Sequence, residues 1–260
     1  MQTAAESIDV ARATHETVLR VGGLFMNSTE MAAAAERQGL SDQVMCLRGR
    51  VAVAGEVDDA TATELLGSFP RSIVRVAWQN SSALSAAEAA AVYAGVCAQW
   101  GHDHLNVISD AAVIADLAET VVDAAEVVDL PLAGAWRRWQ RPTASAARLA
   151  HALMLLRELR FGLHLAAIRA NGLSIPGAVL ASHRGVDGLR RAGWSRSEIA
   201  AAQQDARHIG DLGERCAIVD VEADLGFSSC LGVLDVHAQR TLVDGLARVD
   251  WATRPGPTSG

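Results

Sequence analysis

The sequence predicts a mainly α-helical protein. Half of its 260 residues are hydrophobic, only 4% are aromatic, and alanine is abundant. Alanine is the best helix former, whereas strands favour β-branched and aromatic side chains. Helix-capping signals recur along the chain. The predicted fold is a helical domain with a long central helix, followed by a C-terminal winged-helix-like region, a degenerate helix-turn-helix.

Capping residues mark where the helices begin, and glycine or proline marks where they end. Ser85 and Glu88 have the spacing of a capping box, as do Ser195 and Glu198, and Gly101 is expected to end the helix that Ser85 begins. The expected helices cover 28–37, 85–100, 110–129, 143–171, 176–182, 187–192, 195–209 and 237–249.

The C-terminal half shows a change of pattern after Gly172. Short helices separated by glycine turns are typical of a helix-turn-helix module, and the valine-containing run 216–235 is expected to supply two short strands. The predicted organisation is an N-terminal helical domain (1–142), a long connecting helix that lines the candidate site (143–171), a helix-turn-helix-like C-terminal domain (172–252) and a disordered tail (253–260).

Composition excludes several classes of protein. All 23 basic residues are arginine, which excludes chemistry that needs a lysine amine. A net charge of −7 argues against broad binding to nucleic acid or anionic membranes. The apolar runs are too short to span a bilayer, and the N-terminus lacks a secretory pattern, so we expect a cytoplasmic protein. Four scattered cysteines predict neither disulfides nor a zinc site, and no metal or cofactor is expected.

The segment AHALMLLRELRFGLH places five polar groups in an apolar helix: His151, Arg157, Glu158, Arg160 and His164. Helical geometry puts the two arginines and His164 in one stripe, with His151 and Glu158 in a neighbouring one. Arginines hold carboxylates or phosphates, and histidine and glutamate transfer protons. The alternative is structural, with Glu158 paired to an arginine and the histidines at a domain boundary.

The same segment resembles a known family. A histidine, an apolar stretch, Leu-Arg-Glu-x-Arg and a second histidine are similar to the long helix of actinobacterial proteins described as helix-turn-helix proteins, some of them encoded in specialised-metabolite gene clusters. Earlier family features are echoed by His15, by the run 49–55 that contains Arg50, and by Phe69-Pro70. The sequence departs from the family where Val53 replaces a proline. The resemblance implies a helix-turn-helix architecture and adds His15 and Arg50 to the candidate site.

Two functions follow from these observations. The first is a small-molecule-binding protein of specialised metabolism, acting as a cofactor-independent acid-base enzyme on an anionic or polar organic substrate. Its catalytic candidates are His151, Glu158 and His164, and its substrate-binding candidates are His15, Arg50, Arg157 and Arg160. Alanine-rich helices also favour burial against a second copy, so a homodimer is expected.

The alternative function is a winged-helix transcriptional regulator with a small-molecule ligand. Its recognition helix, 195–209, would read bases through Arg196, Gln203, Gln204 and Arg207. From residue 172 onward, however, nine arginines face eleven acidic residues, whereas a DNA-reading domain is usually basic. DNA is therefore a partner only under this alternative.

Overall fold

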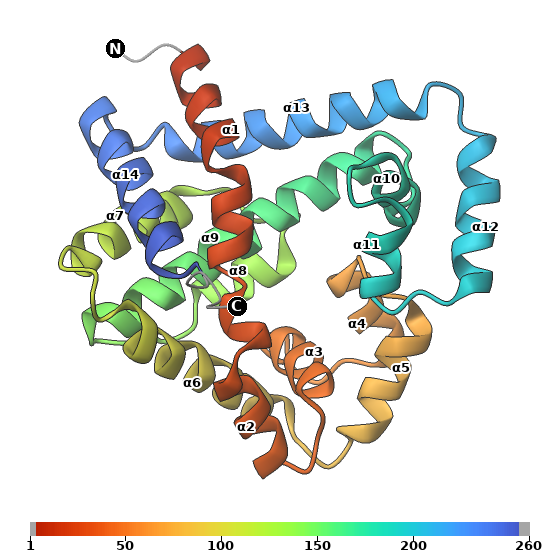
Figure 1. Ribbon diagram of the computed structural model, residues 1–260, viewed down its shortest axis with the longest axis horizontal. Coiled ribbons are helices and arrows are strands. Elements are labelled where there is room, and N and C mark those ends of the chain that lie inside the picture. The colour runs from red at the N-terminus through yellow and green to blue at the C-terminus, as the bar shows by residue number, and fades with distance from the viewer. Residues whose placement is uncertain (1–3, 255–260) are drawn as a thin grey trace, which may run out of the picture.

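The computed structural model describes the backbone of residues 4–254 and the side chains from residue 7 onward. Every regular element in this range is a helix, so the prediction of a mainly α fold is confirmed. In chain order (Figure 1) the elements are α1 (Ala4–Val21), the 3₁₀ helix η1 (Leu24–Asn27), α2 (Thr29–Arg37), α3 (Asp42–Ala52), α4 (Asp59–Leu66), α5 (Arg71–Asn80), α6 (Ala86–Leu105), α7 (Ala111–Ala124), α8 (Pro131–Arg137), α9 (Ser145–Ala170), α10 (Ile175–Ala181), α11 (Gly185–Arg191), α12 (Arg196–Arg207), α13 (Leu212–Leu231) and α14 (Val236–Ala252).

The predicted helix starts agree with the structure. Ser85 and Ser195 both accept a hydrogen bond from the backbone N–H three residues on, and Glu88 and Glu198 complete the two capping boxes. These reciprocal bonds satisfy backbone donors that the first helical turn leaves free. The long central helix is present as α9.

The two strands expected within 216–235 are wrong, because α13 occupies most of that run. Its buried hydrophobic side chains are Val219, Ala223, Phe227 and Leu231. They recur every fourth residue, so one face of a helix carries them all. That face packs against α1 and α9, and this tertiary burial overrides the strand preference of the valines. The expected wing is therefore absent from the described residues.

Helix α6 does not end at Gly101 as expected but continues to Leu105. A Cβ atom at Gly101 would lie 2.5 Å from the Cβ of Ala150 and 2.7 Å from the carbonyl oxygen of Ala146. The glycine is thus a point of close approach between α6 and α9. It serves packing here, whereas the sequence suggested a helix end.

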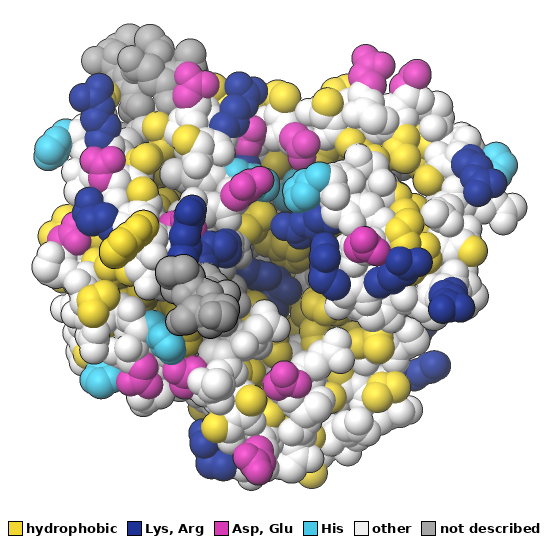
Figure 2. Space-filling model, viewed as in Figure 1, with side chains coloured by type: hydrophobic (Ala, Val, Ile, Leu, Met, Phe, Trp, Pro, Cys, Tyr) yellow, Lys and Arg dark blue, Asp and Glu magenta, His cyan; other side chains and the backbone are white. Residues whose placement is uncertain are grey.

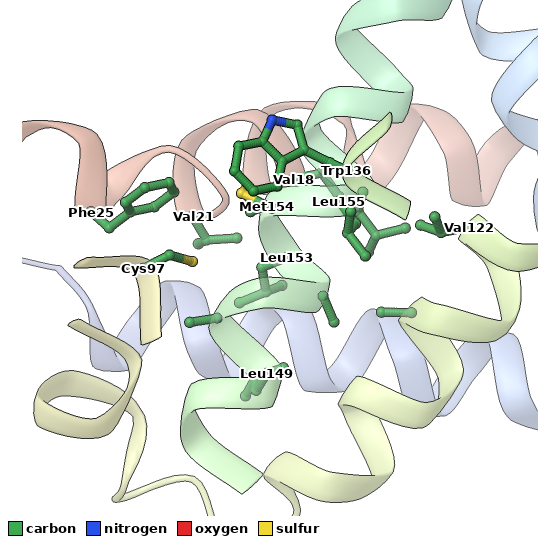
Figure 3. Close-up of a cluster of buried hydrophobic side chains, with 14 of the residues drawn as sticks. Val18, Val21, Phe25, Cys97, Val122, Trp136, Leu149, Leu153, Met154 and Leu155 are labelled. Carbon is green, nitrogen blue, oxygen red and sulfur yellow. The ribbon is translucent and has the colours of Figure 1, made fainter. Parts of the chain in front are cut away.

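The core is built around α9, which is buried along most of its length (Figure 3). Leu149, Leu153, Met154 and Leu155 of α9 meet side chains from α1, η1, α6, α7 and α8. The same cluster takes residues from α13 and α14. Segments from the start, middle and end of the chain therefore share one core.

Two smaller clusters flank this core. One lies within α3–α5, and the other joins the C-terminal half of α9 to α10 and α13. Figure 1 shows α10–α12 at one side of the molecule, beyond the end of α9. None of the helices in the described range combines the length and hydropathy needed to cross a bilayer. Of the predicted disordered tail, residues 255–260 lie outside the described residues.

Two glycines of α6 provide a matched test of the α6–α9 contact. We expect Gly101→Ala to destabilise the protein by about 1–3 kcal/mol, because overpacking at a close approach outweighs the gain in helix propensity. Gly95→Ala is the control, since Gly95 is exposed and a Cβ there meets nothing within 4 Å. It should be neutral or stabilise by up to about 1 kcal/mol. Urea denaturation measures both, and equal stabilisation by the two variants would contradict the packing.

Candidate functional site

A buried ion cluster joins α3 to α9. Arg50 donates to both carboxylate oxygens of Glu158, with distances of 2.9 Å from Nε to Oε1 and 2.8 Å from Nη2 to Oε2. Arg157 donates from Nη1 to the same Oε1 at 2.8 Å. The ring of Phe161, one turn along α9, lies 4.8 Å from the guanidinium of Arg50 and 5.7 Å from that of Arg157. Both cations therefore also contact an aromatic face.

The local packing of α3 explains why Arg50 reaches the carboxylate of Glu158. A Cβ at Gly49 would lie 2.7 Å from the Cβ of Tyr93, so only glycine lets α3 approach α6 this closely. Trp136 of α8 donates from its indole Nε1 to the backbone oxygen of Arg50 at 2.9 Å. That bond satisfies a carbonyl in the last turn of α3, which has no partner within the helix. The backbone of Arg50 is thus fixed from two sides.

Charge in this cluster is unbalanced, because two cations share one anion. Burial raises the pKa of Glu158, but the charges and hydrogen bonds of Arg50 and Arg157 outweigh it and hold the pKa below its ordinary value. Burial and the charge of Arg50 lower the pKa of Arg157. Glu158 is therefore ionised and fully engaged, which disfavours a role as a base. The surplus positive charge lies on the arginine pair.

Arg157 keeps donors free. Only its Nη1 has a hydrogen-bond partner among the described residues, and its Nε and Nη2 are not sealed from solvent; the side chain is 17% exposed. Gly22 and Gly23, at the end of α1, make room for it. A Cβ at Gly22 would lie 2.7 Å from the Cβ of Arg157, and one at Gly23 would lie 2.9 Å from its Nε.

A second polar cluster joins α1, α9 and α13. Arg160 donates to Nδ1 of His15 from Nε at 3.0 Å and from Nη2 at 2.6 Å. Its Nη2 also pairs with Asp224, and its Nη1 donates to the backbone oxygen of Ala223 at 3.4 Å. Arg12 holds the other oxygen of Asp224 at 3.2 Å. Arg160 is fully buried, so it positions its neighbours and has no free face for a ligand.

His164 lies near this second cluster without joining it. Its Nδ1 is buried without a hydrogen-bond partner, and the nearest carboxylate oxygen, on Asp220, is 3.9 Å away, beyond hydrogen-bond distance. Burial and the charges of Arg160 and Arg184 lower the pKa of His164, against the opposing effect of Asp220. His164 is a neutral imidazole at pH 7.

One face of the molecule is hollowed. Figure 2 shows a hollow between α1, α13 and α10–α11, with apolar side chains deep inside and arginines on its walls. The clusters join α9 to α1, α3 and α13, the elements around this hollow (Figure 1). An apolar floor with basic groups on the wall suits an amphiphilic anion.

Two cavities are also present. One has a volume of about 30 Å³, room for about one water molecule, and lies beside Glu158, Phe161 and Arg169. The other, of about 240 Å³, is lined by side chains that include Glu30, Trp100 and His104. In it Nε2 of His104 is 2.9 Å from a carboxylate oxygen of Glu30, so this imidazole is already paired with a carboxylate. Neither cavity fits an anion as the hollow does.

His151 is not brought to the other candidates. It is 2% exposed, and neither ring nitrogen has a hydrogen-bond partner in the described part of the chain. Burial lowers its pKa to about 4, with a smaller contribution from Arg141 in the connector before α9. His151 is therefore neutral and enclosed.

The candidate DNA-reading residues lie on α12. Arg196, Gln204 and Arg207 are exposed, and Gln203 is half-buried. Helices α11 and α12 are joined by the short turn 192–195, which has the length found in a helix-turn-helix.

The turn and the start of α12 are docked on the N-terminal half of the protein. Trp194 donates from Nε1 to the backbone oxygen of Ser68 at 3.0 Å, and Ser72 donates to Glu198 at 3.1 Å. The start of a recognition helix is the part that contacts bases. Here that end also serves as an internal contact.

Sequence comparison agrees with this geometry. Residues 11–222 match a family described as a helix-turn-helix family. The chain belongs to this helix-turn-helix family. The match covers the helices that carry His15, Arg50 and Glu158 as well as α11 and α12, so membership alone does not distinguish a ligand site from a DNA surface. No curated protein and no solved structure matches the chain.

Sequence reasoning missed several residues of the site in this helix-turn-helix protein. Asp224 was hidden because its segment was interpreted as strands, although Asp220 and Asp224 have helical spacing beside the apolar positions of α13. Gly22 and Gly23 also border Arg157, and nothing in the sequence reveals this contact.

Removing the shared anion tests the first cluster. We expect Glu158→Gln to destabilise the protein by about 3–5 kcal/mol at pH 7, because two buried guanidinium groups lose their counter-ion. The pKa of Glu158 is lower in the folded than in the unfolded protein. Its contribution to the free energy of unfolding is therefore fully present above the unfolded-state pKa of about 4.5 and is lost as the pH falls through the folded-state pKa. The difference in free energy of unfolding between the variant and the wild type, measured by urea denaturation, should therefore become smaller below pH 4.5.

The control is Glu16→Gln, since Glu16 is exposed and has no ion pair among the described residues. It should change stability by less than about 0.5 kcal/mol. A Glu158→Gln protein as stable as this control would contradict the ion cluster.

Proposed function

We propose that the protein binds a small anionic organic molecule in the hollow and that Arg157 is its anion-binding residue. One observation carries the proposal: Arg157 shares a single carboxylate with Arg50, and its Nε and Nη2 donors have no partner among the described residues and are not sealed from solvent. A guanidinium with two free N–H groups is suited to a carboxylate or phosphate.

The energetics favour an anion at this place. Burial and the charge of Arg50 both disfavour the charged form of Arg157, and an added anion offsets the repulsion from Arg50. Charge pairing is also stronger in a recess than on an open surface, because the effective dielectric is lower there. The apolar floor of the hollow (Figure 2) would cover the carbon skeleton of the ligand.

An acid-base reaction on the bound molecule is part of the proposal. The Nδ1 of His164 is buried, but its Nε2 has no hydrogen-bond partner among the described residues and is not sealed from solvent. We therefore assign the uptake of a proton to Nε2 of this neutral ring, whereas Glu158 is held by three guanidinium hydrogen bonds. His151 lies apart and is enclosed. We assign the proton transfer to His164 and the binding of the anion to Arg157, within a cytoplasmic homodimer of specialised metabolism.

A transcriptional regulator is the second candidate function. It is favoured by the family match and by the exposure of Arg196, Gln204 and Arg207 on α12. The contacts of Trp194 and Glu198 with the N-terminal half argue against it, because they tie the start of the recognition helix to the body of the protein. We therefore rank ligand binding first.

Arg157→Gln tests the proposal with 4-phenylbutanoate as the probe, an amphiphilic carboxylate. We expect saturable binding to the wild type, and at least tenfold weaker binding to the variant, because a charged hydrogen bond contributes roughly 1.5–3 kcal/mol. Isothermal titration calorimetry measures the affinity.

Arg138→Gln is the matched control, since Arg138 is exposed and its side chain has no hydrogen-bond partner among the described residues. It should bind like the wild type. Equal affinity of all three proteins would refute the role of Arg157. Binding of DNA from upstream of the gene, lost in Arg196→Ala/Arg207→Ala, would favour the regulator instead.

A further inference from the structure

We infer that Arg160 locks His15 in its neutral Nε2–H form, so that His15 donates a hydrogen bond to an oxygen atom of the ligand. The inference rests on the proposed ligand site and names a second recognition group within it. It also narrows the ligand to a carboxylate that carries another oxygen acceptor, such as a carbonyl.

The tautomer follows from the hydrogen bonds. Nδ1 of His15 is 3.0 Å from Nε and 2.6 Å from Nη2 of Arg160. Guanidinium nitrogens donate and never accept in proteins, so Nδ1 must offer its lone pair. The single proton of the neutral ring is then on Nε2. This nitrogen has no hydrogen-bond partner among the described residues and is not sealed from solvent.

Protonation of the ring is also opposed by its surroundings. Burial lowers the pKa of His15, and the charge of Arg160 on α9 lowers it further. His164 on α9 acts in the same direction, while Asp224 and Asp220 on α13 oppose it. A cationic ring would in addition place an N–H against the two donors of Arg160. His15 thus stays neutral.

Arg160 is itself held in place by its other contacts, so the hydrogen bonds that fix the tautomer of His15 are rigid. Its guanidinium pairs with Asp224, donates to the backbone oxygen of Ala223 and lies 5.1 Å from the ring centroid of Phe227. Arg12 holds Asp224 from the other side. Arg160 and Asp224 are therefore positioning residues, and His15 is the group that meets the ligand.

A locked imidazole has a restricted chemistry. With Nδ1 occupied and Nε2 protonated, His15 has no free lone pair and cannot serve as a base, but it can polarise a carbonyl oxygen or stabilise an oxyanion. His164 has no such lock, since its closest carboxylate contact is 3.9 Å long. The two histidines thus differ in role, one as a donor and the other as a proton acceptor.

The spacing of the helix brings the two recognition groups within reach of one small molecule. Arg157 and Arg160 are three residues apart on α9, which places their Cβ atoms about 5–6 Å apart. His15 is bonded directly to Arg160. A ligand with its carboxylate on Arg157 and an oxygen atom a few bonds away can meet Nε2 of His15.

Nitrogen NMR of histidine-labelled protein tests the lock without a ligand. In two-bond ¹H–¹⁵N spectra of the wild type, with His15 assigned through His15→Leu, we expect a protonated Nε2 and an unprotonated Nδ1 at pH 7 to 8. In Arg160→Met, which cannot donate, the ring should regain a pKa near its ordinary value of 6.5. Because that variant may fail to fold, the wild-type spectrum alone decides: a protonated Nδ1 or a wild-type pKa of 6.5 or above overturns the lock.

A pair of probes tests the ligand class. 2-Oxo-4-phenylbutanoate and 4-phenylbutanoate share a carboxylate and a ring, and they differ only in the oxo group. We expect the oxo acid to bind the wild type about tenfold more tightly, as one net hydrogen bond allows, and this preference to disappear in His15→Leu. The control His102→Leu, at an exposed histidine of α6, should keep it.

The outcomes separate the two proposals. Equal affinities of the wild type for both acids overturn the role of His15 while anion binding at Arg157 stands. Failure of both acids to bind overturns the proposed function and this inference with it. A preference that survives in His15→Leu shows that another group recognises the oxo oxygen and refutes the assignment.

Discussion

Helix α9 is covered by α1, α6, α7 and α13, and a helix enclosed in this way must find partners inside the protein for every charge it carries. Each charged residue of α9 in the core is therefore tied to a particular neighbour. Glu158 is met by α3, Arg160 by α1 and α13, and Arg148 by Glu119 of α7. These ion pairs specify which helices surround α9, and the apolar core supplies most of the burial.

The same constraint links the fold to the proposed function. Two of the three charged groups at positions 50, 157 and 158 are cations, so pairing within the cluster leaves one positive charge only half compensated. The free donors of that charge lie on Arg157, against which the glycines just after α1 pack. His15, which is bonded to Arg160, and His164, two turns along α9 from Arg157, are both neutral and differ in their hydrogen bonding. The proposed anion site draws on these groups.

The fold class, the capping boxes and α9 could be predicted from the sequence, because propensity, caps and helical spacing are local properties. The polar cluster was also visible, since charges in an apolar helix need an explanation. Its partners were not, because Asp224 lies 64 residues from Arg160 and Arg50 lies 108 from Glu158. His151 shares a helical stripe with Glu158, yet seven residues place it about 10 Å along the axis, where its neighbours are different. Spacing gives the side of a helix, and packing decides what faces it.

The most direct test of the account is a crystal structure of the protein with 4-(4-bromophenyl)butanoate, located by the anomalous signal of bromine. We expect the carboxylate on Nε and Nη2 of Arg157 and the bromine over the apolar floor of the hollow (Figure 2). Bromine in the cavity beside Trp100 and His104, with an empty hollow, would contradict the central claim.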